Sequence, residues 1–171
     1  MRCLAPALAA CIVGGCYELP HPVFETGHRA PITGTYQCQG LMHASRETIT
    51  ETSTGLIWKD YRYANGSKEI LTLRKMPGTH YAAEFQTDRG TTLAFLDVAS
   101  PQHFDVRVPD LMTQGGAIDA LATKYRIKAS PSIQNQDFFA IFGVDTDMTA
   151  FITAHTPNLL TTVMQCDRID S

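Results

Sequence analysis

The residue patterns that carry common enzyme chemistry are missing from this sequence of 171 residues. Its six histidines form no HxH, HExxH or HxxxH pair, the spacings that bring two imidazoles to one zinc ion. It has no GxSxG nucleophile elbow and no SxxK motif. Asp145-Thr146-Asp147 lacks the glycine and the distal glutamate of a calcium-binding EF-hand loop, and a helix cap is the simpler interpretation. The sequence therefore predicts no metal site, no cofactor and no catalytic residues.

Charge is also scarce. Charged residues make up 18% of the chain, and the formal net charge is -3. The first 16 residues hold one arginine and no acidic residue, so the remainder carries 13 basic against 17 acidic residues, a net charge of -4. Such a domain has no excess of cations with which to displace phosphate counterions, which argues against a nucleic-acid partner. The length and the 44% hydrophobic content fit one globular domain with a short appendage.

The most apolar stretch of the sequence lies at the N-terminus. Met1-Arg2 is followed by an apolar stretch, residues 3–15, which is shorter than the roughly 20 residues of a membrane-spanning helix. No later stretch approaches that length. The end of the stretch, Val13-Gly14-Gly15-Cys16, resembles the lipobox of bacterial lipoprotein precursors, which is a hydrophobic residue, two small residues and a cysteine.

This resemblance implies that residues 1–15 are a signal peptide and that Cys16 is lipidated and becomes the first mature residue. Two or three acyl chains anchor a protein stably, because each buried methylene contributes roughly 0.8 kcal/mol. Tyr17 follows the cysteine where related proteins retained at the inner membrane have Asp. The resemblance thus favours a lipid anchor in the outer membrane, facing the periplasm. Inner-membrane retention, plain secretion and a buried first helix are the alternatives.

The remaining cysteines fit that compartment. Once Cys3 and Cys11 leave with the signal peptide and Cys16 is acylated, Cys38 and Cys166 are left, one near each end of the domain. In an oxidising periplasm two such residues predict a disulfide. Two buried free thiols are the alternative.

Turn signals and hydrophobic periodicity predict the architecture. Residues 16–32 contain three prolines and no periodicity, which is typical of a tether between an anchor and a domain. Residues 33–171 read as one β-rich α+β domain, an antiparallel meander sheet or small barrel of about six or seven strands. Helical spacing predicts short helices near residues 116–124 and 147–155. A last strand over 159–169 should lie near the first and bring Cys166 to Cys38.

Two groups of residues are candidates for a ligand-binding face. Trp58, Tyr61 and Tyr63 lie close together on a predicted strand, where aromatic side chains bind ligands or simply pack a core. His103, Asp105 and Arg107 alternate with apolar residues along one strand. This alternation is typical of any solvated strand face, and it also suits acid–base chemistry.

The sequence thus favours a non-catalytic envelope lipoprotein that acts as a binding, assembly or structural module. Its partners would be the membrane, through the lipid anchor, and another envelope protein. The alternatives are an inhibitor or small-ligand carrier of lipocalin-like type, and a periplasmic hydrolase.

Overall fold

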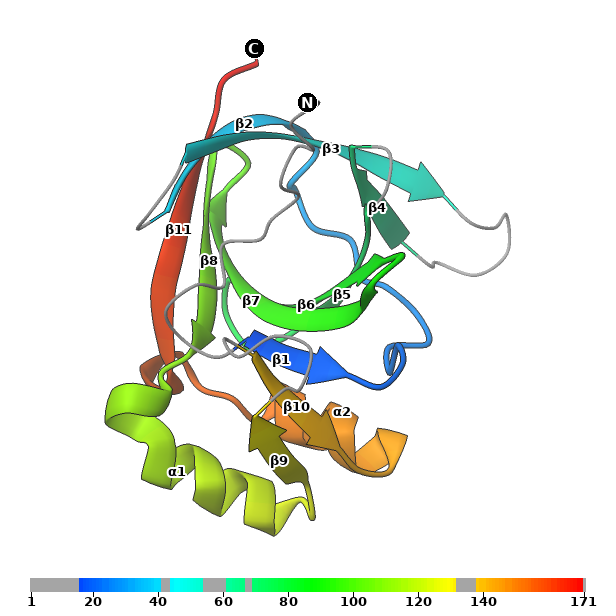
Figure 1. The fold of residues 1–171 in the computed structure, drawn as a ribbon. Helices are drawn as coiled ribbons and strands as arrows, with labels where there is room; N and C mark the ends of the chain where they lie inside the picture. The colour runs from blue at the N-terminus through cyan, green and yellow to red at the C-terminus, as the bar shows by residue number, and fades with distance from the viewer. Residues whose placement is uncertain (1–15, 41–43, 54–60, 67–68, 132–137, 171) are drawn as a thin grey trace, which may run out of the picture.

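A computed structural model describes residues 16–40, 44–53, 61–66, 69–131 and 138–170 of the chain. The predicted β-rich architecture with two C-terminal helices is confirmed (Figure 1). Eight strands form an antiparallel barrel: β2 (Gly34–Gly40), β3 (Ala44–Ser53), β4 (Tyr61–Asn65), β5 (Glu69–Lys75), β6 (His80–Thr87), β7 (Gly90–Ser100), β8 (His103–Pro109) and β11 (Leu160–Arg168).

The barrel is a meander closed by its last strand. β2 to β8 pair in sequence order, and β11 returns to lie between β8 and β2. Cys166 is the register partner of Cys38 across β11 and β2, as the sequence predicted. The Gly66 backbone has a φ of 62°, so the Asn65-Gly66 turn uses the left-handed conformation that glycine adopts most easily.

A smaller sheet branches from the barrel. β1 (Cys16–Leu19) pairs antiparallel with the first half of β7 and parallel with β10 (Phe138–Phe142), and β10 pairs with β9 (Lys128–Pro131). Two α-helices, α1 (Leu111–Lys124) and α2 (Asp145–Thr153), and the 3-10 turn η1 (Pro157–Leu159) lie on the same side of the barrel, below it in Figure 1. No helix among the described residues is long and apolar enough to cross a membrane.

The alternation of side chains along the strands builds two hydrophobic cores. Inward-facing residues such as Tyr81, Ala83 and Phe85, together with Phe104 and Val106, fill the barrel. The second core lies between the outer face of β6 and β7 and the layer of β1, β10 and the helices. Its largest members are Tyr17, Phe24, Phe95, Ile141, Phe151 and Ile152.

The structure corrects the prediction of a tether in residues 16–32. These residues pack against the domain: residues 16–19 form a strand, and Val23, Phe24 and Ile32 are buried. Glu84, on the outer face of β6, accepts hydrogen bonds from the backbone N–H groups of Val23 (2.6 Å) and Phe24 (3.1 Å). The prolines gave this segment the composition of a linker, but its apolar residues supply part of both cores.

Both predicted helices begin earlier than expected. The first starts at Leu111 because Asp110 caps it, accepting a hydrogen bond from the Thr113 backbone N–H at 3.0 Å. Gly115 and Gly116 lie inside it, with nothing within 4 Å of the place a Cβ atom would take. The second runs over Asp145–Thr153 with Val144 at the N-cap position. The predicted cap Asp147 lies instead in its first turn.

Candidate functional site

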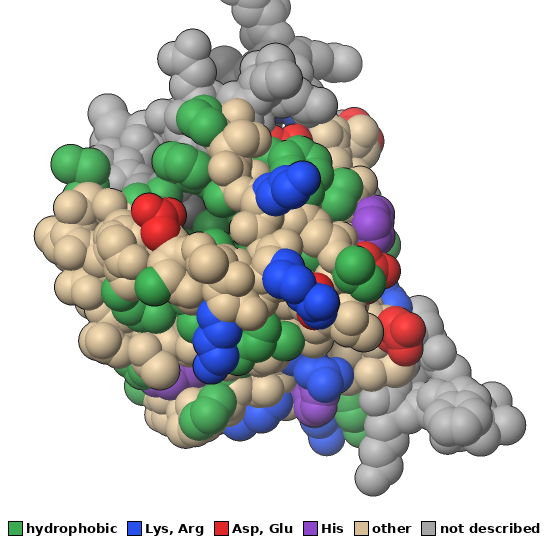
Figure 2. All heavy atoms as spheres, turned by 90° about the horizontal axis from the view of Figure 1, so that it is seen from below, with side chains coloured by type: hydrophobic (Ala, Val, Ile, Leu, Met, Phe, Trp, Pro, Cys, Tyr) green, Lys and Arg blue, Asp and Glu red, His purple; other side chains and the backbone are tan. Residues whose placement is uncertain are grey.

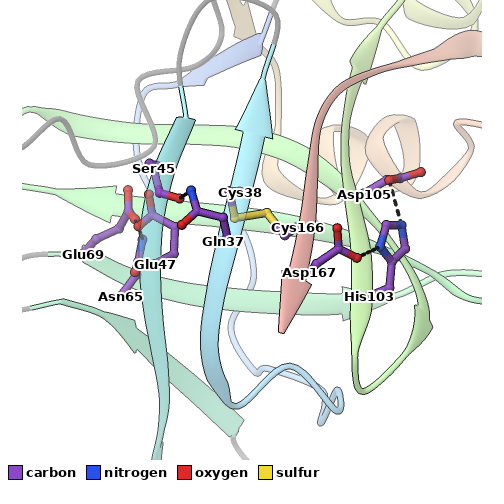
Figure 3. Close-up of a disulfide and its surroundings, with 10 residues drawn as sticks. All are labelled: Gln37, Cys38, Ser45, Glu47, Asn65, Glu69, His103, Asp105, Cys166 and Asp167. Atoms are coloured by element: carbon purple, nitrogen blue, oxygen red, sulfur yellow. Dashed lines mark hydrogen bonds and ion pairs between the residues drawn. A yellow bond between two sulfur atoms is a disulfide. The ribbon is translucent and has the colours of Figure 1, made fainter. Parts of the chain in front are cut away.

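The barrel interior is held together by a disulfide between its first and last strands. The Sγ atoms of Cys38 and Cys166 are bonded, with the Cα atoms 4.0 Å apart and a sequence separation of 128 residues. Figure 3 shows this bond lying between two groups of polar side chains. One group faces the barrel interior, and the other lies on the outer wall.

The interior group joins two buried glutamates through one amide. The Asn65 Nδ2 atom donates to Glu47 Oε2 at 2.8 Å and to Glu69 Oε2 at 2.9 Å. Burial raises the pKa of Glu69; the bond from Asn65 opposes this effect, and the neighbouring Glu47 charge adds to it. The cavity that Glu47 and Asn65 line has a volume of about 10 Å³, the space of about one water molecule. This cavity therefore has no room for a substrate beside Glu47.

The outer group clamps β8 to β11. His103 Nδ1 lies 2.7 Å from Asp167 Oδ1, and His103 Nε2 lies 3.2 Å from Asp105 Oδ1. The two carboxylates raise the pKa of His103, the Asp167 hydrogen bond being the largest cause. Because both ring nitrogens face carboxylates, the imidazolium is favoured and neither nitrogen is available as a general base. This geometry favours a structural ion cluster over an acid–base site.

A second ion cluster on the same wall compensates a like-charge contact. Asp97 of β7 lies directly opposite Asp105 of β8, an unfavourable arrangement for two carboxylates. Arg107 NH1 lies 3.8 Å from Asp97 Oδ2, and His80 Nδ1 lies 3.5 Å from Asp97 Oδ1. Thr79 donates a hydrogen bond of 2.5 Å to the same carboxylate. His103, Asp105 and Arg107 therefore share the outward face of β8, where they join neighbouring strands through charge.

The structure separates the predicted aromatic face. Tyr63 is buried in the barrel, where its hydroxyl donates to the Ala30 carbonyl and accepts from the Ala30 N–H, so it is a core residue. Tyr61 packs partly buried against the same core, with the Arg29 guanidinium 5.8 Å from its ring centre. Trp58 lies outside the described residues. The Tyr63 hydroxyl forms hydrogen bonds with backbone groups of the N-terminal segment. These bonds explain a tyrosine at this position without a ligand.

The predicted lipidation residue is part of the fold. Cys16 begins β1, is buried, and has its sulfur disulfide-bonded in this structure. Acylation requires the free thiol, so the disulfide-bonded and the lipidated states of Cys16 exclude one another. Lipidation at Cys16 thus stays a prediction about the precursor before its domain folds.

The described residues also form an open hollow that the sequence analysis did not predict. It lies where β10 leads into α2 and has a volume of about 460 Å³, within the range of small-ligand sites. Phe142 and Val144 are large apolar side chains left 46% and 67% exposed there. Arg126 and Lys128 contribute positive charge. The remaining lining residues are Gly143, Thr146 and Asp147.

Arg126 has an unusual backbone conformation for its residue type. Among the described residues it is the single non-glycine residue with positive φ, 57°, and it lies just after the C-cap of α1, where glycine is the common choice. This conformation costs roughly 1–2 kcal/mol for a residue with a Cβ atom. Its NH2 atom lies 2.9 Å from both carboxylate oxygens of Asp147. An exposed ion pair contributes roughly 0–1 kcal/mol, so stability alone does not account for an arginine here.

The clue to the hollow was present in the sequence in a weak form. The segment Lys124-Tyr125-Arg126-Ile127-Lys128 alternates cations with apolar residues, a pattern typical of a helix end or a strand. Its pairing with Phe142 depends on the β9–β10 contact, in which Lys128 is the register partner of Phe142. Within the part of the chain that the structure describes, no group of three or more metal-binding side chains is present.

No family model, no curated protein and no solved structure matches this chain.

Proposed function

We propose that the chain is a lipid-anchored protein of the bacterial cell envelope whose barrel domain is a non-catalytic binding module. The lipobox-like Val13-Gly14-Gly15-Cys16 supports the anchor. The module is supported by one observation above all. The described cavity inside the barrel holds about 10 Å³, whereas the hollow outside it holds about 460 Å³. The outer surface is therefore the better place for a partner.

The fold gives this proposal a geometrical consequence. β1 begins at the cysteine that would carry the lipid, and Tyr17 is buried against α2. A lipidated Cys16 would have to expose the sulfur that is buried in this structure, and it would then hold the domain close to the bilayer without a long linker. The module would act at the membrane surface and would contact only partners that lie within the length of the domain from the bilayer.

Acyl labelling of intact bacterial cells tests the anchor. Labelled fatty acid should enter the wild-type chain and a Cys38→Ser variant, which retains the lipobox. It should not enter a Cys16→Ser variant, which should accumulate as an uncleaved precursor. Label in the Cys16→Ser chain would refute the proposal. A wild-type chain with an intact mass that retains residues 1–15 and shows Cys16 in a disulfide would refute it equally.

A small-ligand carrier of lipocalin-like type is the second candidate function, because a closed eight-stranded barrel suits it. A carrier would need the barrel to open around its ligand. Chemical-shift changes of Leu96 and Val106, which line the interior cavity, on adding an apolar ligand would favour it. Changes confined to the outer surface would favour the binding module.

A further inference from the structure

We propose that the hollow beside α2 binds a small anionic amphiphile, meaning a molecule with an apolar body and a carboxylate or phosphate head. This proposal specifies the class of ligand that the binding module takes. It rests on the proposed function only in assuming that the module is not an enzyme. Seen from below, the face that carries α1, β9 and α2 presents lysine and arginine side chains beside hydrophobic ones (Figure 2).

The apolar body has a defined place. Phe142 and Val144 are two of the five large hydrophobic side chains left exposed in the described residues, and they flank Gly143. Gly143 lets the backbone of this floor pack closely against the core behind it. A Cβ atom added there would lie 2.7 Å from Ile127 Cδ1 and 3.4 Å from Met148 Cγ. A concave apolar floor suits an inserted chain or ring better than a flat membrane surface.

The anionic head is selected by charge at the rim. Arg126 and Lys128 both line the hollow, on a domain whose overall charge is negative. The single acidic lining residue, Asp147, is engaged by Arg126 through one guanidinium nitrogen. This contact orients the guanidinium, and its other N–H groups remain able to donate to a carboxylate or phosphate. The lining as a whole therefore carries two cations against one anion.

The left-handed backbone of Arg126 is an independent observation in the same place. Glycine would occupy this position without strain, and the ion pair with Asp147 does not outweigh that strain. A non-glycine residue with a strained backbone conformation is expected where its side chain has a role in binding. Arg126→Gly should thus leave the unfolding midpoint unchanged or higher while removing one of the two cations.

The test titrates the full 171-residue chain with decanoate, decyl phosphate and decyltrimethylammonium below their micelle concentrations. Amide chemical shifts of Gly143 and Thr146 locate the binding. We expect both anions to bind and the cation to bind at least about tenfold more weakly. Tighter binding of decyl phosphate would indicate a phospholipid-type head, and tighter binding of decanoate a fatty acid or a chain carboxylate.

Matched variants separate the site from general hydrophobic binding. Phe142→Ser, Lys128→Gln and Arg126→Gly should each weaken anion binding by about tenfold. Ile70→Ser, which removes another exposed apolar side chain, and Arg89→Gln, which removes another exposed cation, should not. Unchanged affinity in a folded Arg126→Gly chain, equal binding of the cationic amphiphile, or shifts outside the hollow would overturn the proposal. The acyl-labelling experiment tests the lipid anchor independently of these titrations, so the anchor and this ligand site can be refuted separately.

Discussion

Acid should destabilise this protein through one buried histidine. His155 is 3% exposed and lies among the rings of Tyr17, Phe95 and Phe151. Its Nε2 atom lies 3.1 Å from the Tyr17 hydroxyl, and its Nδ1 atom lies 3.0 Å from the Phe151 carbonyl oxygen. The carbonyl can only accept, so Nδ1 carries the proton and Nε2 accepts from Tyr17. A neutral imidazole satisfies both contacts.

The magnitude follows from the pKa of this group. Burial lowers the pKa of His155 from 6.5 to about 4. Between these values the unfolded chain binds a proton that the folded chain does not, so the free energy of unfolding decreases as the pH falls through this window. Above about pH 6.5 the histidine is mostly neutral in both the folded and the unfolded chain, so it lowers the free energy of unfolding very little there. At pH 4.5 the loss amounts to about 2.5 kcal/mol, since each pKa unit corresponds to ~1.4 kcal/mol.

Other groups titrate nearby, so a variant must isolate the effect. Burial raises the pKa values of Glu69 and Glu84, which favours the folded state on acidification and opposes the histidine. A His155→Gln chain retains these carboxyl groups and keeps one donor and one acceptor at position 155. Urea unfolding of both chains from pH 7.5 to pH 4.5 should show the wild type losing about 2.5 kcal/mol more than the variant. Parallel stability curves would refute a buried neutral histidine.

Two further predictions concern the barrel and its N-terminal segment. A Cys38→Ala, Cys166→Ala double variant should lose about 4–5 kcal/mol in urea unfolding, because the disulfide closes a loop of 128 residues in the unfolded chain. A loss below about 1 kcal/mol would show that the unfolded chain is not constrained in this way. Glu84→Leu should expose the amides of Val23 and Phe24 to faster hydrogen exchange and cost about 2–3 kcal/mol, because two buried N–H groups lose their acceptor. Glu84→Gln, which keeps an acceptor oxygen, is the control and should protect both amides.

Most of the barrel could be predicted from sequence because most of its strands carry their own signal. The exception is β3, which the expected six or seven strands did not include, because Ile49 is the one large apolar residue among its ten. β2 and β8 overlap the alternating segments GTYQCQG and QHFDVRV. The two cysteines available for a disulfide predicted that β2 lies near the last strand. Residues 16–32 could not be placed in the same way. Their burial depends on Glu84 and on β7, which lie more than 60 residues away in sequence. Local composition carries no trace of such a partner.

The candidate site was predictable only in part for the same reason. The alternation at His103, Asp105 and Arg107 correctly gave an outward face, but the ion pairs that explain it come from Asp97 and Asp167 on other strands. Tyr63 was a candidate binding residue because it lies near two other aromatic residues, and core packing was the alternative. Its hydroxyl has a partner that local sequence does not indicate. That partner is the backbone of Ala30, contributed by the segment interpreted as a tether.

The strand β7 belongs to both hydrophobic cores. Ala94 and Leu96 face the barrel interior, while Leu93 and Phe95 face the layer of β1 and the helices. Neither core can be dismantled without loosening a strand on which the other depends. The barrel and its helical layer should therefore unfold in a single cooperative transition, with no stable intermediate in which one survives alone. Thermal transitions followed at Phe151 and at Phe104 should coincide, and a fragment that ends after β8 should not fold.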